Sequence, residues 1–262
     1  MKSDFSFFDQ PEILQSIFFP RKDFINPDSS EGQTYFIQVE DKIKISCRYW
    51  VEGKDSPSIL YFHGNGETTG DYESIAKLYK KIGINLFVAD FRGYGLSNGE
   101  PTFSSMIKDA HIIFREFKTI IKEGGYKENI FLMGRSLGSI SAIELAYHYQ
   151  ESICGLIIES GFSGCSLIPR FQTMNNDFNL REKNGILGGR KIQSIRIPTL
   201  IIHAEYDSIL PVIEGIDLYK NSGAEDKDIL IIPKADHNNL MLVGQEIYFK
   251  KIEEFIKISN IT

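Results

Sequence analysis

The sequence predicts an α/β protein, with a mainly parallel sheet and helices on both of its faces. Three observations lead to this prediction. Short apolar runs alternate with amphipathic helical patterns, a Gly-x-Ser-x-Gly turn joins one such run to a helix, and polar residues follow several of the runs. The 262 residues are 42% hydrophobic, which is enough for one large core, so we expect a single domain over residues 1–262.

Charge and composition exclude several classes of protein. The net charge is −6 with acids and bases interspersed, so the basic face that nucleic-acid binding needs is not expected. No apolar run approaches the roughly 18 residues of a membrane-spanning helix, and acids near the N-terminus argue against a signal peptide. The cysteines Cys47, Cys154 and Cys165 lack metal-ligand spacing, and Cys154 is expected to be buried. We therefore expect a cytoplasmic protein without a metal site.

Residues 1–33 form an N-terminal lead-in segment that is rich in phenylalanine and isoleucine and is interrupted by Pro11 and Pro20. The favoured interpretation is that this segment packs over the edge of the sheet or over a helix. The alternative is a surface that contacts a membrane or a partner through residues 1–20.

From residue 34 the apolar pattern has a period of two, which predicts an antiparallel hairpin of strands 35–39 and 43–50. Further strands are expected at 58–62, 85–89, 130–133, 154–158, 199–204 and 229–232. Helices are expected at 71–82, 102–122, 137–149, 213–219 and 243–258. Residues 161–195 have weak periodicity, and form either one irregular core helix or a short cap-like insertion.

The Gly-x-Ser-x-Gly pattern places Ser136 on a sharp turn between a buried strand and a helix. Side chains at Gly134 and Gly138 would collide with neighbouring backbone in such a turn, and the serine itself would adopt a strained conformation. The hydroxyl is then exposed above the sheet. Ser136 is therefore the candidate nucleophile; the alternative is a tight turn whose serine only caps the helix.

Two further residues complete a nucleophilic triad in the chain order Ser…Asp…His. In open α/β sheets the site forms at the carboxyl ends of the strands. Asp207 follows strand 199–204, and His237 lies between the last strand and the last helix. A serine hydroxyl needs a base to take its proton, and a carboxylate can orient the imidazole of that base.

Other acids and histidines compete for these roles. Asp207 is preferred to Glu205 because the residues after it lead into a helix, and Asp236 is expected to shape a turn. His203 lies within a strand and is interpreted as a core histidine with satisfied hydrogen bonds. His111 and His148 lie in predicted helices and are expected to be core or surface residues.

An oxyanion hole requires two preorganised backbone donors. The amide of Leu137, at the start of the helix, is the first candidate. The second is the amide of Asn65, in the loop after strand 58–62, where Gly64 allows close approach and His63 is expected to brace the loop. The alternative is that this loop is only a glycine-rich turn.

These residues together resemble the α/β-hydrolase superfamily, and within it the small Bem46-like esterases and the related ABHD depalmitoylase-type proteins. The resemblance rests on residues 63–66, on residues 90–99, on the turn at Ser136, and on the settings of Asp207 and His237, and it spans residues 34–258. It implies an eight-stranded fold whose second strand is antiparallel, hydrolysis without a cofactor, and a structural role for Arg92. Two features depart from the pattern: Arg135 precedes the serine, and residues 161–195 leave room only for a small lid.

We therefore expect a serine hydrolase that cleaves a small-molecule carboxylic ester or thioester. The apolar residues within 161–195 suggest a pocket for short to medium acyl chains. Two alternatives stay open at this point. One is an amidase similar to serine aminopeptidases, and the other is a non-catalytic binding protein on the same fold.

Overall fold

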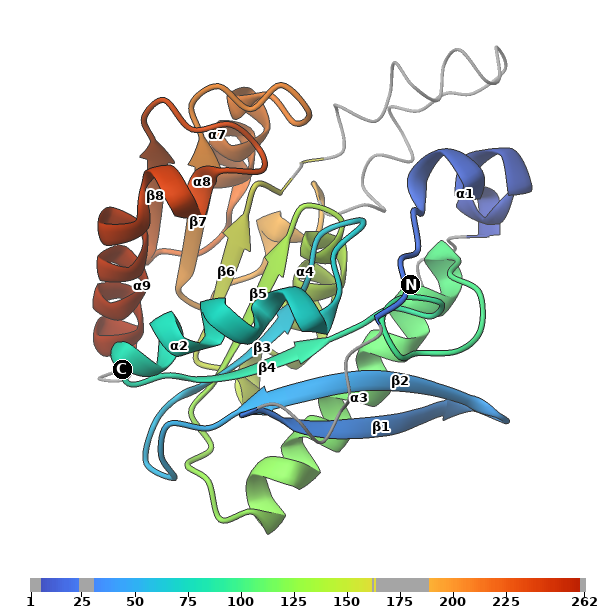
Figure 1. Ribbon diagram of the computed structural model, residues 1–262. Helices are drawn as coiled ribbons and strands as arrows, with labels where there is room; N and C mark the ends of the chain where they lie inside the picture. Colours follow the sequence, from blue (N-terminus) through green and yellow to red (C-terminus); the bar gives the residue numbers. More distant parts are fainter. Residues whose placement is uncertain (1–5, 24–30, 162, 164–188, 260–262) are drawn as a thin grey trace. The chain divides into compact units, whose positions relative to one another are not determined.

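The computed structural model describes residues 6–23, 31–161, 163 and 189–259 (Figure 1). In these residues, eight strands form one mostly parallel sheet in the order β1-β2-β4-β3-β5-β6-β7-β8. The strands are β1 (Gln33–Glu40), β2 (Ile43–Trp50), β3 (Ser58–Phe62), β4 (Asn85–Ala89), β5 (Ile130–Arg135), β6 (Gly155–Glu159), β7 (Thr199–Ala204) and β8 (Lys227–Ile232). The predicted fold class is confirmed.

The described helices precede β1 or come after β3 along the chain. They are α1 (Pro11–Ile17), α2 (Glu73–Lys81), α3 (Phe103–Glu123), α4 (Gly138–Tyr149), α7 (Val212–Asn221), α8 (Leu240–Val243) and α9 (Gln245–Ser259). No described helix combines the length and the apolar character needed to cross a membrane.

The described residues fall into two compact units, a first unit up to residue 132 and a second unit from residue 133 on. In the first unit β2 pairs antiparallel with both β1 and β4, whereas β3 and β4 are parallel. The expected hairpin and the expected antiparallel second strand are therefore both present. In the second unit β6, β7 and β8 are parallel neighbours, and α4, α7 and α9 pack on β6, β7 and β8 respectively.

Strands β3 to β7 are buried at every residue, which explains why they appear in the sequence as continuous apolar runs. In strand β1, buried residues alternate with exposed ones over part of its length, and Phe36 is one of the exposed residues. Cys154 is only partly buried, so the expectation of full burial was wrong. It precedes β6 instead of lying inside it.

Two helices differ from the expected ranges. The predicted helix 71–82 begins earlier, with a 3-10 turn over Thr69–Tyr72, because Thr68 and Asp71 cap each other's backbone amides. The predicted helix 243–258 corresponds to α9, which begins at Gln245; Val243 ends the short helix α8, and Gly244 separates the two. A Cβ at Gly244 would lie 2.5 Å from Cγ2 of Ile232, so only glycine allows this approach to β8.

The loop after β4 is held together by buried polar groups. Asp90 accepts hydrogen bonds from the backbone amide and the hydroxyl of Thr69, at 2.9 and 3.1 Å. A Cβ at Gly95 would lie 2.2 Å from the Asp90 carboxylate, so glycine is required there. Arg92 binds both carboxylate oxygens of Asp109, at 2.7 and 2.9 Å, as expected of a structural residue.

The N-terminal lead-in is part of the core of the first unit. Phe8 and Phe18 are buried, and both rings contact Phe103 of α3, with centroid distances of 5.2 and 5.3 Å. Ile13 and Ile17 of α1 are buried as well, whereas Phe19 is 53% exposed. Among the described residues, the lead-in therefore packs over a helix, as favoured from the sequence.

Candidate active site

The turn at Ser136 joins β5 to α4 and has the strained geometry predicted for it. Ser136 has φ of +49°, a left-handed conformation that residues with a side chain rarely adopt. A Cβ at Gly134 would lie 2.4 Å from the carbonyl oxygen of Gly138, so the glycine is required by close backbone packing. The amide of Ser136 donates to the carbonyl of Glu159 in β6 at 2.9 Å. This bond anchors the serine at the carboxyl end of the sheet.

Ser136, His237 and Asp207 form a continuous hydrogen-bond chain. Nε2 of His237 lies 3.1 Å from Oγ of Ser136, and Nδ1 of His237 lies 2.7 Å from Oδ2 of Asp207. The three residues follow the carboxyl ends of β5, β8 and β7. The structure thus brings together three side chains that are up to 101 positions apart in sequence. A chain of this kind can move a proton from the serine hydroxyl to the imidazole.

The Asp207 carboxylate is oriented by its own loop. Oδ1 accepts hydrogen bonds from the backbone amides of Ile209 and Leu210, at 3.0 and 2.7 Å, which leaves Oδ2 facing the His237 ring. Burial alone would raise the pKa of Asp207. The hydrogen bonds from His237 and Leu210 outweigh burial and lower that pKa below its ordinary value. The carboxylate is therefore ionised at neutral pH and can fix the imidazole tautomer.

The competing acids have structural partners. Oε2 of Glu205 accepts the backbone amide of Lys234 at 2.8 Å. Oδ1 of Asp236 accepts the amides of Asn238 and Asn239, at 2.8 and 3.1 Å, and so shapes the turn after His237 as expected. In the described part of the chain, the His237 imidazole is hydrogen-bonded to Asp207 and to neither of these acids.

His203 is buried at the end of β7, closer to the hydrogen-bond chain than the sequence indicated. Its Nε2 donates to the carbonyl of Leu210 at 2.8 Å and lies 3.5 Å from Oδ2 of Asp207. Burial lowers the pKa of His203, so the ring is neutral at pH 7. Its Nδ1 has no hydrogen-bond partner among the described residues. The expectation of a fully satisfied core histidine was therefore wrong for one of its two nitrogens.

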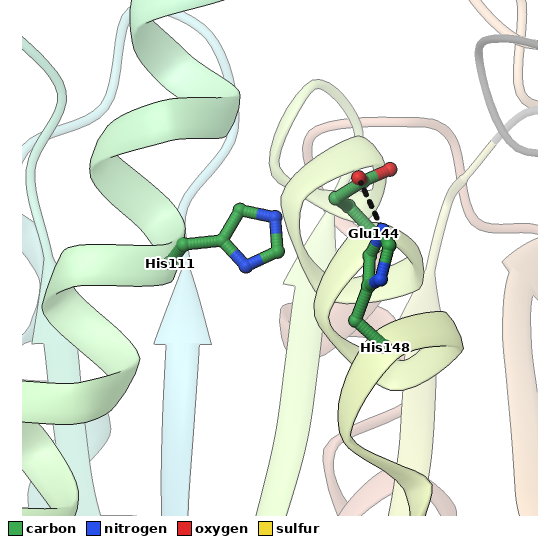
Figure 2. Close-up of side chains that lie close together, drawn as sticks. All are labelled: His111, Glu144 and His148. Carbon is green, nitrogen blue, oxygen red and sulfur yellow. Dashed lines mark hydrogen bonds and ion pairs between the residues drawn. The ribbon is translucent and has the colours of Figure 1, made fainter. Parts of the chain in front are cut away.

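The two helical histidines, His111 and His148, are not part of the hydrogen-bond chain of Ser136, His237 and Asp207. His148 lies in the last turn of α4 and is hydrogen-bonded through Nε2 to Oε1 of Glu144, one turn earlier, at 3.1 Å (Figure 2). His111 projects from α3 and is partly buried. Both are helix residues of the core or surface, as expected.

Of the two predicted oxyanion donors, Leu137 directly follows the serine at the start of α4. Its backbone amide makes no hydrogen bond to another described residue. The positive end of the helix dipole favours negative charge at this position. The predicted role of Leu137 is consistent with this geometry and stays a prediction.

Asn65 is held through its side chain. Its amide nitrogen donates to the carbonyl of Ile17, and its Oδ1 accepts from the hydroxyl of Tyr94 at 2.6 Å and from the amide of Phe19 at 3.0 Å. The lead-in therefore fixes the loop of Asn65, which the sequence did not indicate. The role of the Asn65 backbone amide as an oxyanion donor stays a prediction.

His63 braces the same loop. Its Nδ1 donates to the carbonyl of Gly64 at 2.7 Å, and its Nε2 lies 3.2 Å from Oδ1 of Asp90. Burial opposes the charged imidazolium, but Asp90 and the Gly64 carbonyl raise the pKa of His63 above its ordinary value. The amide of Gly64 donates to Glu67 at 2.7 Å, which closes the loop.

A surface hollow of about 480 Å³ lies away from this chain of hydrogen bonds. It is lined by residues of the last turn of α4, of the turn after it, and of the segment before β7: Tyr147, His148, Gln150, Glu151, Arg196 and Ile197. Arg196 precedes β7, whereas Asp207 follows it. The hollow is therefore at the opposite end of β7 from Asp207.

Comparison with known proteins gives matches over most of the chain. A family model described as serine aminopeptidase, S33, matches residues 53–177. Protein bem46 of Schizosaccharomyces pombe is 26% identical over 234 residues, which cover 86% of this chain and 76% of bem46. Human alpha/beta hydrolase domain-containing protein 17B is 26% identical over 200 residues, covering 76% of this chain and 66% of that protein.

Solved structures give the same fold. The Pyrococcus furiosus esterase Pf2001 superposes with a TM-score of 0.71 at 19% identity, covering 92% of this chain and 98% of the esterase. Est1E from Butyrivibrio proteoclasticus, solved with ferulic acid bound, has a TM-score of 0.70 at 18% identity, covering 87% of this chain and 100% of Est1E. The chain therefore has the α/β-hydrolase fold. The fold class expected from the motifs is confirmed, and bem46 and the alpha/beta hydrolase domain-containing protein 17B are relatives of the kinds that the motifs resemble.

Two parts of this chain differ in how well the sequence predicted them. The apolar residues expected to line an acyl pocket, including Phe171, Phe178 and Leu180, lie outside the described residues. In contrast, the described chain contains a buried ion pair that sequence reasoning missed, between Arg135 and Glu159. The sequence signal for this ion pair was that Arg135 and Glu159 each lie at the end of an apolar run that predicts a buried strand.

Proposed function

We propose that this α/β-hydrolase cleaves carboxylic ester or thioester bonds of small molecules, with Ser136 as nucleophile, His237 as base and Asp207 as the acid that orients His237. The observation that carries the proposal is the hydrogen-bond chain, at 3.1 and 2.7 Å, that starts from a serine in a strained left-handed conformation. The esterases among the structural neighbours agree with it.

The mechanism follows from the direction of these hydrogen bonds. Nδ1–H of His237 donates to Asp207, so Nε2 has a free electron pair that accepts the proton of Ser136. Oγ of Ser136 then bonds to the substrate carbonyl carbon, and the negative charge moves to the carbonyl oxygen. The amides of Leu137 and Asn65 are the proposed donors to that oxyanion.

Collapse of this intermediate breaks the bond to the alcohol or thiol, which leaves with the proton held by His237. A water molecule then gives a proton to His237 and attacks the acyl-enzyme, and the acid is released as Ser136 regains its proton. Every proton passes through Nε2 of His237. The reaction as written needs no cofactor.

A second candidate is cleavage of an aminoacyl amide, because the matching family model is described as serine aminopeptidase. Both reactions use the same three residues. The difference depends on the leaving group and the substrate pocket. A panel of acyl esters, thioesters and aminoacyl amides, compared by kcat/KM, would separate the two.

The proposal is tested by labelling with a fluorophosphonate, which reacts covalently with an activated serine. We expect labelling of the wild type and hydrolysis of p-nitrophenyl esters, both lost in Ser136→Ala. Ser139→Ala is the matched control, in which labelling and hydrolysis should both be retained. Ser139 is a buried serine of α4, and its hydroxyl is already used in a hydrogen bond to the Ser136 carbonyl. A folded wild-type protein that neither labels nor hydrolyses any substrate would favour the non-catalytic binding protein. The cytoplasmic location stays a prediction.

A further inference from the structure

Arg135, the residue before the proposed nucleophile, has its charged side chain buried at the end of β5. Its Nε lies 3.2 Å from Oε1 of Glu159, which ends the neighbouring strand β6 and is 1% exposed. The other carboxylate oxygen of Glu159 accepts the hydroxyl of Tyr248, from α9, at 2.7 Å. Both charged groups are therefore compensated by opposite charge and hydrogen bonds, as burial requires.

The guanidinium also reaches the loop that carries the proposed base. One of its terminal nitrogens donates to the backbone carbonyl of His237 at 2.6 Å and lies 3.4 Å from Oδ1 of Asn238. Arg135 thus binds the backbone of the same residue whose ring contacts Ser136. The planar guanidinium can bind Glu159 and His237 at once, whereas lysine has a single nitrogen.

These contacts close a ring around the proposed nucleophile and base. Glu159 binds the amide of Ser136 through its backbone carbonyl and binds Arg135 through its carboxylate. Arg135 in turn is covalently joined to Ser136 and hydrogen-bonded to His237. The distance between Ser136 Oγ and His237 Nε2 is therefore controlled by a short chain of directed bonds.

We propose that Arg135 is a positioning residue that holds the His237 loop against Ser136, an inference that rests on the proposed function. Stability alone is a weak explanation for the pair, because buried ion pairs often stabilise no more than well-packed apolar residues do. The bond to the His237 carbonyl gives Arg135 a role that an apolar residue cannot replace. Catalysis depends on this geometry, since a misplacement of about 1 Å can lower a rate about 100-fold.

The test is the double variant Arg135→Met/Glu159→Gln, which removes both charges and so leaves no buried charge unpaired. We expect kcat for p-nitrophenyl acetate to fall between about tenfold and 100-fold, with KM changed less than about twofold, because Arg135 holds the base and not the substrate. The rate of fluorophosphonate labelling should fall in parallel. Arg135→Lys should lie between the wild type and the double variant.

The matched control is Arg92→Met/Asp109→Asn, which removes a second arginine–carboxylate pair, between a partly buried arginine and a buried aspartate, with bonds of 2.7 and 2.9 Å. In the described chain this pair has no contact with His237. We expect its kcat to stay within about twofold of the wild type at temperatures where it is folded. Wild-type kcat in the Arg135 double variant would overturn the proposal. Equal losses in both double variants, in proportion to a fall in Tm, would also overturn it.

A readout that does not need activity separates this inference from the proposed function. Crystal structures of the wild type and the Arg135 double variant would give the distance from Ser136 Oγ to His237 Nε2. We expect that distance to exceed about 3.5 Å in the variant, beyond hydrogen-bond range. If the wild type is inactive, the proposed function fails, and an unchanged distance in the variant would overturn the positioning role independently.

Discussion

At the scale of single residues, the Asp207 carboxylate is oriented by hydrogen bonds to both of its oxygens. Two amides of its own loop bind Oδ1, and the His237 ring binds Oδ2. In Asp207→Asn the side-chain amide cannot accept from His237 with the charge of a carboxylate, so the wrong imidazole tautomer is favoured. We expect kcat to fall by about 10⁴, as in serine protease triads. Steady-state ester hydrolysis would measure it, with circular dichroism to check the fold.

Glu205→Gln is the matched control for this variant. Glu205 is two positions away and binds the backbone amide of Lys234 instead of the imidazole. We expect turnover within about twofold of the wild type, because surface substitutions of this kind change little. Near-normal turnover in Asp207→Asn, with a large loss in Glu205→Gln, would move the orienting role to Glu205.

His203 predicts a pH dependence of stability. Burial lowers its pKa in the folded protein, while the unfolded chain binds a proton near the ordinary value of about 6.5. Below that pH the unfolded state binds more protons than the folded state, so the free energy of unfolding falls as the pH falls. One such group contributes a slope of up to about 1.4 kcal/mol per pH unit. The contribution is constant above the unfolded pKa.

His203→Gln isolates this contribution, because glutamine keeps a donor for the Leu210 carbonyl but does not titrate. We expect the free energy of unfolding of this variant to fall less between pH 7 and pH 5 than that of the wild type. Urea unfolding at several pH values would give both curves. Parallel curves would show that His203 takes up its proton equally in the folded and unfolded states.

At the scale of the elements, the strands were the most predictable part of the fold. β2, β3, β4 and β7 have the predicted bounds. β3, β4 and β7 are buried apolar runs flanked by turn residues, whereas β2 has the period-two pattern of a hairpin strand. The positions of Ser136, Asp207 and His237 were also predictable, since each follows the carboxyl end of a strand and occurs in the expected chain order.

Features that depend on tertiary contacts could not be predicted in the same way. The ion pair of Arg135 with Glu159 forms because β5 and β6 are neighbours in the sheet. The order of strands in a sheet cannot be read from the sequence of the individual strands. The anchoring of Asn65 by the lead-in similarly joins residues 48 positions apart. Sequence periodicity contains no information on such side-chain partners.

The boundary between α8 and α9 provides a test at this scale. Gly244 lies inside an amphipathic pattern that predicts one helix, but its missing Cβ makes room for Ile232 of β8. Gly244→Ala should shift α8 or β8 and destabilise the fold by about 1–3 kcal/mol. In the control Gly53→Ala the nearest atom to the new Cβ is Oγ of Ser56, at 3.4 Å, so a smaller effect is expected. Equal Tm values for the two variants would contradict this account.

At the scale of the whole molecule, the question is whether the N-terminal lead-in packs into the core or forms a surface that contacts a membrane or a partner. Neighbouring phenylalanines give a matched pair for this question. Phe18 is 6% exposed and contacts the ring of Phe103, whereas Phe19 is 53% exposed. Both have the same chemistry, so their variants differ only in burial.

We expect Phe18→Ala to lower the free energy of unfolding by about 3 kcal/mol, because a buried ring is lost and a cavity remains. Phe19→Ala should change it by no more than about 0.5 kcal/mol. Urea unfolding of both variants would measure the difference, and sedimentation with lipid vesicles would test the alternative of a membrane contact. If Phe18→Ala left stability unchanged and Phe19→Ala abolished vesicle binding, the lead-in would be a membrane-contacting surface instead of part of the core.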